Sequence, residues 1–384
     1  MKINNRLDSI GVYHFKTIDG IKEKRRKEGK KIIDLSIGDP DLAVEPSILN
    51  ALIQGFDEVG FNKYPPYDGI NFLKNQVIDY YKNRFGVHLE LEEVAILIGS
   101  KEGISNVIPA VCDIKDAVIV PEPGYPVYSS ASKLWGCIPY TVPIKESNNY
   151  LVDFTEIPKE VCTKAKLMFI NYPNNPTGAK GSGEFFSEVV KFCEESNIVL
   201  CNDAAYSEII SPEESPLSIL QFDKNKHSVE FGTLSKLYNM TGFRIGYAVG
   251  NKEVISALVK VKSNLDSGQF IPIQKAAVTA LNLDKTYGDE IRKIYFKRRT
   301  VAEKVLKEKN IQFFTTESTF YIWCKTPKGY TTHEFCSEIL DRYGLVVTPG
   351  SCFGTLGYDY FRIALTCSWQ IIEEGLASLP RYDN

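Results

Sequence analysis

Four polar side chains stand just after apolar runs in the middle of the chain. Asn175 follows the run KLMFINYP, and Asp203 ends the run NIVLCND. Tyr206 lies three residues beyond Asp203, and Lys236 follows the run SVEFGTLS. A buried Asp stabilises a protonated pyridine nitrogen, Asn and Tyr bind a phenolic oxygen, and a Lys of lowered pKa forms a Schiff base with an aldehyde. These four residues therefore indicate a site for a pyridine cofactor that acts as an electron sink.

A phosphate group on such a cofactor needs a helix N-terminus and cations. The segment GSKEGISNVIPAV offers both, because Ser100 and Lys101 open a predicted helix directly after an apolar run. The two residues could instead simply cap that helix, and the same geometry would also suit a phosphate. Further donors nearby in the sequence are Thr233, Ser235 and Arg244.

The runs that carry these residues read as buried strands, rich in Ile, Val and Leu with few interior charges. Helix-like stretches such as GEFFSEVVKFCEES lie between some of them, with apolar residues at three- and four-residue spacing. This alternation predicts an α/β fold with a mostly parallel sheet that is covered on both faces. The run FRIGYAVG could be an antiparallel exception, since only a short connection joins it to SVEFGTLS.

The spacing of the polar residues predicts that they meet at one edge of the sheet. Asn175 and Asp203 are 28 residues apart, and Asp203 and Lys236 are 33 residues apart. Each interval is about one strand–helix–strand unit of ~30 residues. Loops that follow parallel strands are where α/β proteins assemble their sites.

After about residue 282 the pattern changes to a long charged helix followed by a few strands and helices. The segments TYGDEIRKIYFKRRTVAEKVLKEKN and THEFCSEILDRYG predict helices, while QFFTTESTFYIWCK, LVVTPG and YFRIALT contain strand-like runs. We therefore expect a smaller α+β domain in the C-terminal third, with a boundary near residues 274–282.

The composition points to a cytoplasmic protein with no nucleic-acid or membrane partner. The formal net charge of −3 gives no attraction to polyanions, and no apolar run approaches the ~18 residues of a membrane span. Nine scattered cysteines without a CxxC pair favour reduced thiols, and four dispersed histidines give no sign of a metal site. The N-terminal segment has no apolar core of a signal peptide. We interpret the charged run KEKRRKEGKK (22–31) as a solvated helix end.

Taken together, the motifs resemble those of the class I/II aminotransferases, which are pyridoxal-phosphate (PLP) enzymes of fold type I. The resemblance runs from IDLSIGDP near residue 33 to YFRIALT near residue 360. It implies a seven-stranded, mostly parallel sheet in a large cofactor-binding domain (40–278), and a small domain formed by residues 1–39 plus 279–384. Single motifs of this kind are weak, whereas their order along the chain is specific. The motifs between the two ends are IGSKEG, PEPGYPVY, NYPNNPTG, NDAAYSEI and TLSKLYNMTGFRIGYAVG.

The resemblance also implies roles in binding the cofactor. Lys236 would form the Schiff base and then carry the proton of the substrate α-carbon. Asp203 would pair with the pyridinium nitrogen, Tyr206 and Asn175 would bind the phenolic oxygen, and Tyr125 would stack on the ring. The residues implied to hold the phosphate are Ser100, Lys101, Thr233, Ser235 and Arg244.

Further residues are implied to bind the substrate or to join two subunits. Arg362 would grip the α-carboxylate with two parallel hydrogen bonds, helped by Asn175 and the backbone of Gly38. Tyr13 resembles a substrate-facing tyrosine of some members. Tyr64 matches the tyrosine that reaches the phosphate of the neighbouring subunit, which implies a homodimer with shared active sites.

Each of these residues also has a structural interpretation. A single lysine such as Lys236 is more often a solvated surface charge. Asp203 could cap a following helix, Arg362 could form a structural ion pair, and Tyr125 could be part of the core. The number and order of the motifs favour the cofactor site.

Transamination between an amino acid and a 2-oxo acid is the leading hypothesis for the reaction. The alternative within the same fold is a C–S β-lyase, but such lyases usually carry Pro-Gly where this chain has NMTGFRIG, and a His within the NNP motif. A non-catalytic regulator of this fold would need a DNA-binding domain ahead of residue 33. We expect no such domain, because the residues before Ile33 are too few to form one.

The substrate is less well defined. RLDSIGVYHF, IGSKEGI and VVTPGSCFG are most similar to LL-diaminopimelate aminotransferases and their relatives. The chain departs from that subgroup at three places: GVYHF (11–15) in place of Pro-Pro-Tyr-Leu-Phe, Leu237 in place of Thr, and Phe243 in place of Trp. The last two change packing more than chemistry. The first falls where substrate would bind and leaves the diaminopimelate assignment open.

Overall fold

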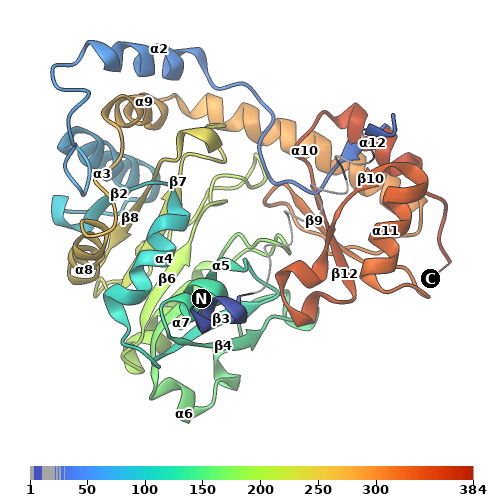
Figure 1. Ribbon diagram of the computed structural model, residues 1–384, viewed down its shortest axis with the longest axis horizontal. Coiled ribbons are helices and arrows are strands. Elements are labelled where there is room, and N and C mark those ends of the chain that lie inside the picture. The colour runs from blue at the N-terminus through green and yellow to red at the C-terminus, as the bar shows by residue number, and fades with distance from the viewer. Residues whose placement is uncertain (1–3, 11–21, 23–24, 26, 30, 384) are drawn as a thin grey trace.

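The apolar runs of the middle of the chain form one seven-stranded sheet in the computed structural model (Figure 1). The structure describes residues 4–10, 22, 25, 27–29 and 31–383. The spatial order of the strands is β2-β8-β7-β6-β5-β3-β4, and every neighbouring pair is parallel except the two pairs that β8 makes. Their bounds are β2 (Val94–Leu97), β3 (Ala117–Glu122), β4 (Ile138–Pro143), β5 (Ala165–Ile170), β6 (Val199–Asp203), β7 (Ser228–Thr233) and β8 (Gly246–Gly250).

Both the seven-stranded sheet and its antiparallel exception are confirmed. β8 runs antiparallel to β7 and β2, as the short connection from β7 predicts. The strand missed by the sequence is β4, whose residues are mostly exposed or half-buried. β4 lies at the edge of the sheet and contains Pro139 and Pro143, and proline is tolerated in strands mainly at edges.

β5 explains why the inner strands are apolar at every position. Leu167 and Phe169 belong to one core cluster, and Met168 and Ile170 belong to the other. Successive side chains of a strand point to opposite faces, so a sheet covered on both sides needs apolar residues throughout. The first cluster contains residues of α4 (Ser100–Val111), α5 (Val127–Leu134) and α8 (Lys252–Lys262), and the second contains residues of α3 (Asn71–Phe85), α7 (Gly183–Glu195) and α9 (Ile271–Leu281).

The C-terminal third forms the smaller α+β part that the change of pattern predicts (Figure 1, orange to red). A three-stranded antiparallel sheet has the order β11-β12-β9, and β1 pairs in parallel with β10. The strands are β1 (Ile33–Asp34), β9 (Tyr321–Lys325), β10 (Leu345–Val346), β11 (Thr348–Pro349) and β12 (Tyr360–Ala364). The remaining helices are α2 (Pro46–Gln54), α6 (Lys159–Cys162), α10 (Lys285–Glu308), α11 (Thr332–Tyr343) and α12 (Trp369–Ala377).

The interpretation of residues 22–31 as a solvated helix end is wrong for Lys22. Lys22 is only 4% exposed, and its Nζ donates to Oδ2 of Asp34 at 2.8 Å. A lysine can be buried when a carboxylate compensates its charge. Lys27 is exposed, as the pattern predicts.

Two further features concern the chain as a whole. Among the described residues, no helix is long and apolar enough to cross a membrane. All nine cysteines are free thiols.

Helix α4 approaches the sheet closely at Gly103. We therefore expect alanine to change the free energy of unfolding differently at Gly103 and at the less crowded Gly288. A Cβ added at Gly103 would lie 2.4 Å from Leu97, whereas one added at Gly288 of α10 would lie 3.7 Å from its nearest neighbour, Leu237. We expect Gly103→Ala to lower the free energy of unfolding by ~1–3 kcal/mol through overpacking. Gly288→Ala should raise it by ~0.5–1 kcal/mol through helix propensity. Urea unfolding of both variants tests this, and an equal effect of the two substitutions would contradict it.

Candidate active site

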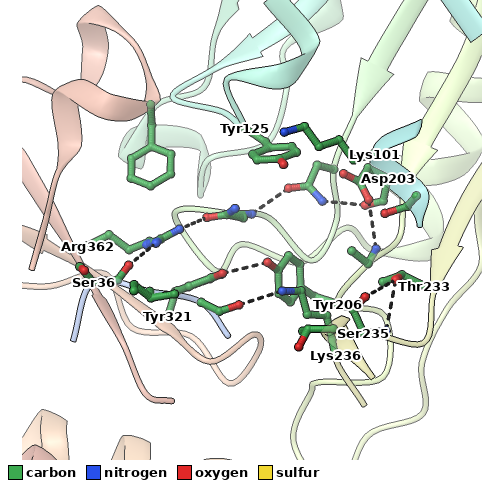
Figure 2. Close-up of a pocket in the computed structure, with 18 of the residues that line it drawn as sticks. Ser36, Lys101, Tyr125, Asp203, Tyr206, Thr233, Ser235, Lys236, Tyr321 and Arg362 are labelled. Atoms are coloured by element: carbon green, nitrogen blue, oxygen red, sulfur yellow. Dashed lines mark hydrogen bonds between the residues drawn. The ribbon is translucent and has the colours of Figure 1, made fainter. Parts of the chain in front are cut away.

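The carboxyl ends of β5, β6 and β7 open into a cavity of about 390 Å³ (Figure 2). Residues from the C-terminal part, including Arg362, close its other side. The cavity brings together all the predicted site residues except Tyr13 and Tyr64. Those that line it are Gly38, Ser100, Lys101, Tyr125, Asn175, Asp203, Tyr206, Thr233, Ser235, Lys236, Arg244 and Arg362.

Lys236 points into this cavity from the turn that follows β7. Its Nζ donates a hydrogen bond to the carbonyl oxygen of Gly38 at 2.8 Å. Burial lowers the pKa of the Lys236 ammonium, although the nearby Tyr321 and Asp39 oppose that shift. A lower pKa makes the neutral, nucleophilic amine more accessible near neutral pH.

Asp203 ends β6 and is 4% exposed. Its Oδ2 accepts a hydrogen bond from the hydroxyl of Tyr128 at 2.7 Å. Burial raises the pKa of this carboxyl to about 6, while the hydrogen bonds from Tyr128 and from the Ala205 backbone and the charge of Lys236 lower it. A turn rather than a helix follows Asp203, so the alternative role as a helix cap is wrong.

Asn175 and Tyr206 stand beside Asp203 at the same sheet edge. The backbone N–H of Asn175 donates to Oδ1 of Asn171 at 2.8 Å, and Nδ2 of Asn171 donates to the carbonyl oxygen of Asp203 at 2.6 Å. Asn171 therefore joins the loop after β5 to the end of β6. The hydroxyl of Tyr206 lies 2.9 Å from that of Tyr321. In Figure 2, Tyr125 lies on one side of the cavity and Tyr206 on the other.

A second group of donors surrounds the N-terminus of α4. Ser100 and Lys101 form its first turn, as predicted. Burial and the charge of Arg244 both lower the pKa of the Lys101 ammonium, because two cations lie close together. Gly99 has φ +74°, and a Cβ there would lie 2.4 Å from the Arg244 guanidinium. Glycine at this position therefore leaves room for Arg244 beside the helix end.

These donors suit a phosphate by their chemistry. A twelve-residue helix presents its N-terminus, two cations stand beside it, and the hydroxyls of Thr233 and Ser235 lie 3.0 Å apart next to them. An anion placed here would relieve the repulsion between the two cations. The site thus combines an amine, a buried carboxylate and an anion pocket in one cavity.

Arg362 lies on β12 and is 2% exposed. Its NH1 donates to Oδ1 of Asn175 at 2.7 Å, and its NH2 donates to the carbonyl oxygen of Ser36 at 2.8 Å. The centre of its guanidinium lies 4.1 Å from the ring centroid of Tyr321 and 4.7 Å from that of Phe353. Polar and aromatic contacts hold the planar group in one orientation at the cavity wall.

Two predicted residues are not placed in this cavity. Tyr64 is 86% exposed and does not line it. Tyr13 lies outside the described residues, as does the whole segment 11–15.

Sequence reasoning missed several residues of the cavity wall or its support. Asn171 and Tyr128 lie inside the motifs NYPNNPTG and PEPGYPVY, so those motifs could have indicated them. Tyr321 and Phe353 lie in apolar segments that look like ordinary core. No polar residue or spacing in the sequence singles them out.

Comparison with known proteins identifies the family. The family described as aminotransferase class I and II matches residues 30–379. The chain belongs to this family. An LL-diaminopimelate aminotransferase of Aquifex aeolicus is 43% identical over 367 residues, which cover 95% of both chains. The enzyme of the same name from Natranaerobius thermophilus is 40% identical over 384 residues and covers both chains completely.

Solved structures share the fold of this aminotransferase. Substrate-bound BacF from Bacillus subtilis matches with a TM-score of 0.96 at 32% identity over the whole of both chains. Aspartate aminotransferase from Thermus thermophilus with maleate matches with a TM-score of 0.91 over 98% of both chains, and at 23% identity it bears on the fold alone. The prediction of PLP fold type I is confirmed.

The reaction class and cofactor follow from the family. The chain is a PLP-dependent aminotransferase that acts on amino acids and 2-oxo acids. The amine of Lys236, the buried Asp203 and the donors around α4 fit the aldehyde, the pyridine nitrogen and the phosphate of this cofactor. The comparisons favour the aminotransferase over the C–S β-lyase alternative.

The raised pKa of Asp203 predicts how stability of the cofactor-free aminotransferase depends on pH. The folded protein holds the Asp203 proton more tightly than the unfolded chain, because the pKa rises from 3.8 to about 6. The resulting stabilisation is fully present below pH ~4 and is lost as the pH rises through 6. From pH 5 to pH 7 the wild type should therefore lose about 1 kcal/mol of unfolding free energy relative to Asp203→Asn. Urea unfolding at both pH values measures this, and a difference that does not change with pH would refute it.

Proposed function

We propose that this enzyme transfers the amino group of LL-diaminopimelate to a 2-oxo acid, with the cofactor attached to Lys236. The support for the donor is the 40–43% identity, over nearly full length, to relatives named LL-diaminopimelate aminotransferase. Leu237 and Phe243, which depart from that subgroup, do not line the cavity. The departure at GVYHF (11–15) lies outside the described residues.

The observation that best supports this reaction is the position of Lys236. It lines the same cavity as the anion pocket and Arg362. When bound, pyridoxal phosphate supplies the aldehyde for Schiff-base formation and a protonated ring that acts as an electron sink. Lys236 is assigned the Schiff base and, as a free amine, the transfer of the proton from the substrate α-carbon. Its lowered pKa suits both tasks, since each needs the neutral Nζ at some stage.

The residues around Lys236 are assigned to separate parts of the cofactor. Asp203 would hold a proton on the pyridine nitrogen by its charge. Tyr206 and Asn175 would donate to the phenolic oxygen, and Tyr125 would stack on the ring. The phosphate is assigned to Ser100, Lys101, Thr233, Ser235 and Arg244.

The substrate is assigned to the opposite wall of the cavity. Arg362 binds the α-carboxylate, and Asn175 and the backbone of Gly38 complete that site. Asn175 already accepts from Arg362 in the structure, which keeps its side chain next to the carboxylate position. Tyr13 is assigned to the substrate side chain.

The enzyme is further proposed to be a homodimer in which Tyr64 reaches the phosphate of the neighbouring subunit. The ring of Phe56 lies 5.5 Å from that of Phe61 and 5.9 Å from that of Phe270, so the three form an aromatic cluster near the surface. Phe56 is 49% exposed and Phe270 is 38% exposed. Grouped exposed apolar side chains are typical of protein interfaces.

The proposal also includes the domain boundaries and the location of the enzyme in the cell. The large domain comprises residues 40–278, and the small domain comprises residues 1–39 plus 279–384. The parallel pairing of β1 with β10 supports joining the N-terminal segment to the C-terminal part. A cytoplasmic location is in keeping with nine free cysteines.

A donor assay tests the proposed substrate. Incubation of the holoenzyme with LL-diaminopimelate and 2-oxoglutarate should form glutamate, measured by coupled glutamate dehydrogenase or by mass spectrometry. DD-diaminopimelate is the matched control, because it has the same composition and the opposite configuration at both α-carbons, and it should give no product. If LL-diaminopimelate fails while alanine, aspartate or tyrosine reacts, the substrate proposal is wrong and the family assignment stands.

A subunit-mixing experiment tests the roles of Lys236 and Tyr64 together. Lys236→Ala alone should be inactive and give no borohydride-reducible label, and Tyr64→Ala alone should bind pyridoxal phosphate weakly. In a mixed dimer, one site combines an intact Lys236 with an intact Tyr64 from the partner. Unfolding and refolding an equal mixture should therefore restore wild-type cofactor affinity in about a quarter of all sites. If mixing restores nothing, Tyr64 does not act across subunits; a label that persists in Lys236→Ala would exclude Lys236 as the attachment site.

A further inference from the structure

Tyr321 lies between the two walls of the active-site cavity and contacts both of them. It is the first residue of β9, is 2% exposed and lines the cavity. Its hydroxyl oxygen lies 2.9 Å from the hydroxyl oxygen of Tyr206, and its ring centroid lies 4.1 Å from the Arg362 guanidinium. Figure 2 shows it below Arg362, with a dashed line to Tyr206. One side chain thus joins the cofactor side of the site to the carboxylate side.

The direction of the hydrogen bond between the two tyrosines follows from proton counting. Each hydroxyl has one hydrogen to donate and lone pairs to accept with. If Tyr206 gives its hydrogen to the phenolic oxygen of the cofactor, its own oxygen can only accept from Tyr321. Successive hydrogen bonds in such a chain polarise and strengthen one another. Tyr321 would therefore make Tyr206 a stronger donor.

The ring of Tyr321 has a separate contact with Arg362. A guanidinium near an aromatic ring is attracted by the negative face of the ring, and the contact limits its rotation. Phe353 makes a second contact of this kind at 4.7 Å. The ring therefore helps to fix the plane in which Arg362 can meet a carboxylate.

The position of Tyr321 is fixed from several directions. Its backbone N–H donates to Oγ1 of Thr319 at 3.1 Å, and its carbonyl oxygen accepts from NH2 of Arg299 at 2.7 Å. A Cβ added at Gly38 would lie 1.8 Å from the Tyr321 hydroxyl oxygen. Glycine at position 38 is therefore required for this hydroxyl to reach Tyr206.

We propose that Tyr321 is a positioning residue that donates its hydroxyl hydrogen to Tyr206, and so strengthens the hydrogen bond of Tyr206 to the cofactor, while its ring orients Arg362. The inference rests on the role proposed above for Tyr206. It gives the hydroxyl and the ring of Tyr321 separate tasks. Substitutions that remove only one of them can therefore test each task.

Tyr321→Phe removes the hydroxyl and keeps the ring. Tyr206 would then donate a weaker hydrogen bond to the phenolic oxygen of the bound cofactor, and the anionic form of this oxygen would be less stable. The spectroscopic pKa of the bound cofactor, followed by visible absorbance against pH, should rise by roughly 0.5 pH units. The KM for the amino donor should stay within about twofold of wild type, because the ring still faces Arg362.

Three further variants separate this effect from general disturbance of the site. Tyr295→Phe is the matched control, because Tyr295 is a buried tyrosine whose ring also packs on Phe320, and its hydroxyl has no hydrogen-bond partner within the described part of the chain. It should leave the spectroscopic pKa unchanged. Tyr206→Phe should raise that pKa more than Tyr321→Phe does, and the double variant should match Tyr206→Phe alone. Tyr321→Leu, which also removes the ring, should raise the KM for the donor roughly threefold or more.

The possible results distinguish this inference from the proposed function. If Tyr206→Phe shifts the spectroscopic pKa and Tyr321→Phe does not, the donor role of Tyr321 is wrong and that of Tyr206 stands. An additive shift in the double variant would also overturn it, since Tyr321 would then act independently of Tyr206. If Tyr206→Phe itself has no effect, the role of Tyr206 in the proposed function fails. An unchanged KM in Tyr321→Leu would overturn the role of the ring.

Discussion

Parallel pairing of β5, β6 and β7 is the constraint on which the rest of the site depends. Parallel neighbours end at the same edge of a sheet, so the loops that follow them meet there whatever their sequence. Asn175 follows β5, Asp203 is the last residue of β6, and Lys236 follows β7. Their separation along the chain therefore becomes proximity in space through backbone hydrogen bonding alone. Both faces of the sheet must then be covered, which accounts for the apolar strands and the helices on either side.

Gathering charged groups at this edge has an electrostatic cost that a cofactor can relieve. Burial raises the pKa of Asp203 and lowers that of Lys236, so each group is disfavoured in its charged form. Lys101 and Arg244 repel each other beside the helix α4. A cationic ring nitrogen would compensate the charge of Asp203, an aldehyde would react with the neutral amine of Lys236, and a phosphate would relieve the repulsion between the two cations. The electrostatics of the protein alone thus favour such a ligand, independently of any relative.

The sequence was sufficient to predict residues that follow strands and belong to ordered motifs, such as Asp203 and Lys236. It could not predict Tyr321, because a tyrosine in an apolar strand looks like core until the partner of its hydroxyl is known. It was wrong about Lys22, since a charged run read without its partners does not reveal the carboxylate of Asp34. Contacts between segments distant in the chain have no local pattern. The apolar runs therefore identified the central sheet and the cofactor side of the cavity better than the opposite wall.

Helix α10 connects that opposite wall to the loop that follows strand β6 of the central sheet. Buried Arg292 of α10 pairs with Glu208, two residues beyond Tyr206, and its Nε donates to the Glu208 carbonyl oxygen at 2.9 Å. Buried Arg299, two turns further along the helix, donates to the carbonyl oxygen of Tyr321 at 2.7 Å. Hydrogen bonds from a charged donor are stronger than those between neutral groups, so the two arginines link both segments to the same helix. Helix α10 therefore helps to hold Tyr206 and Tyr321 in a common geometry, and with them the cofactor and carboxylate sides of the cavity.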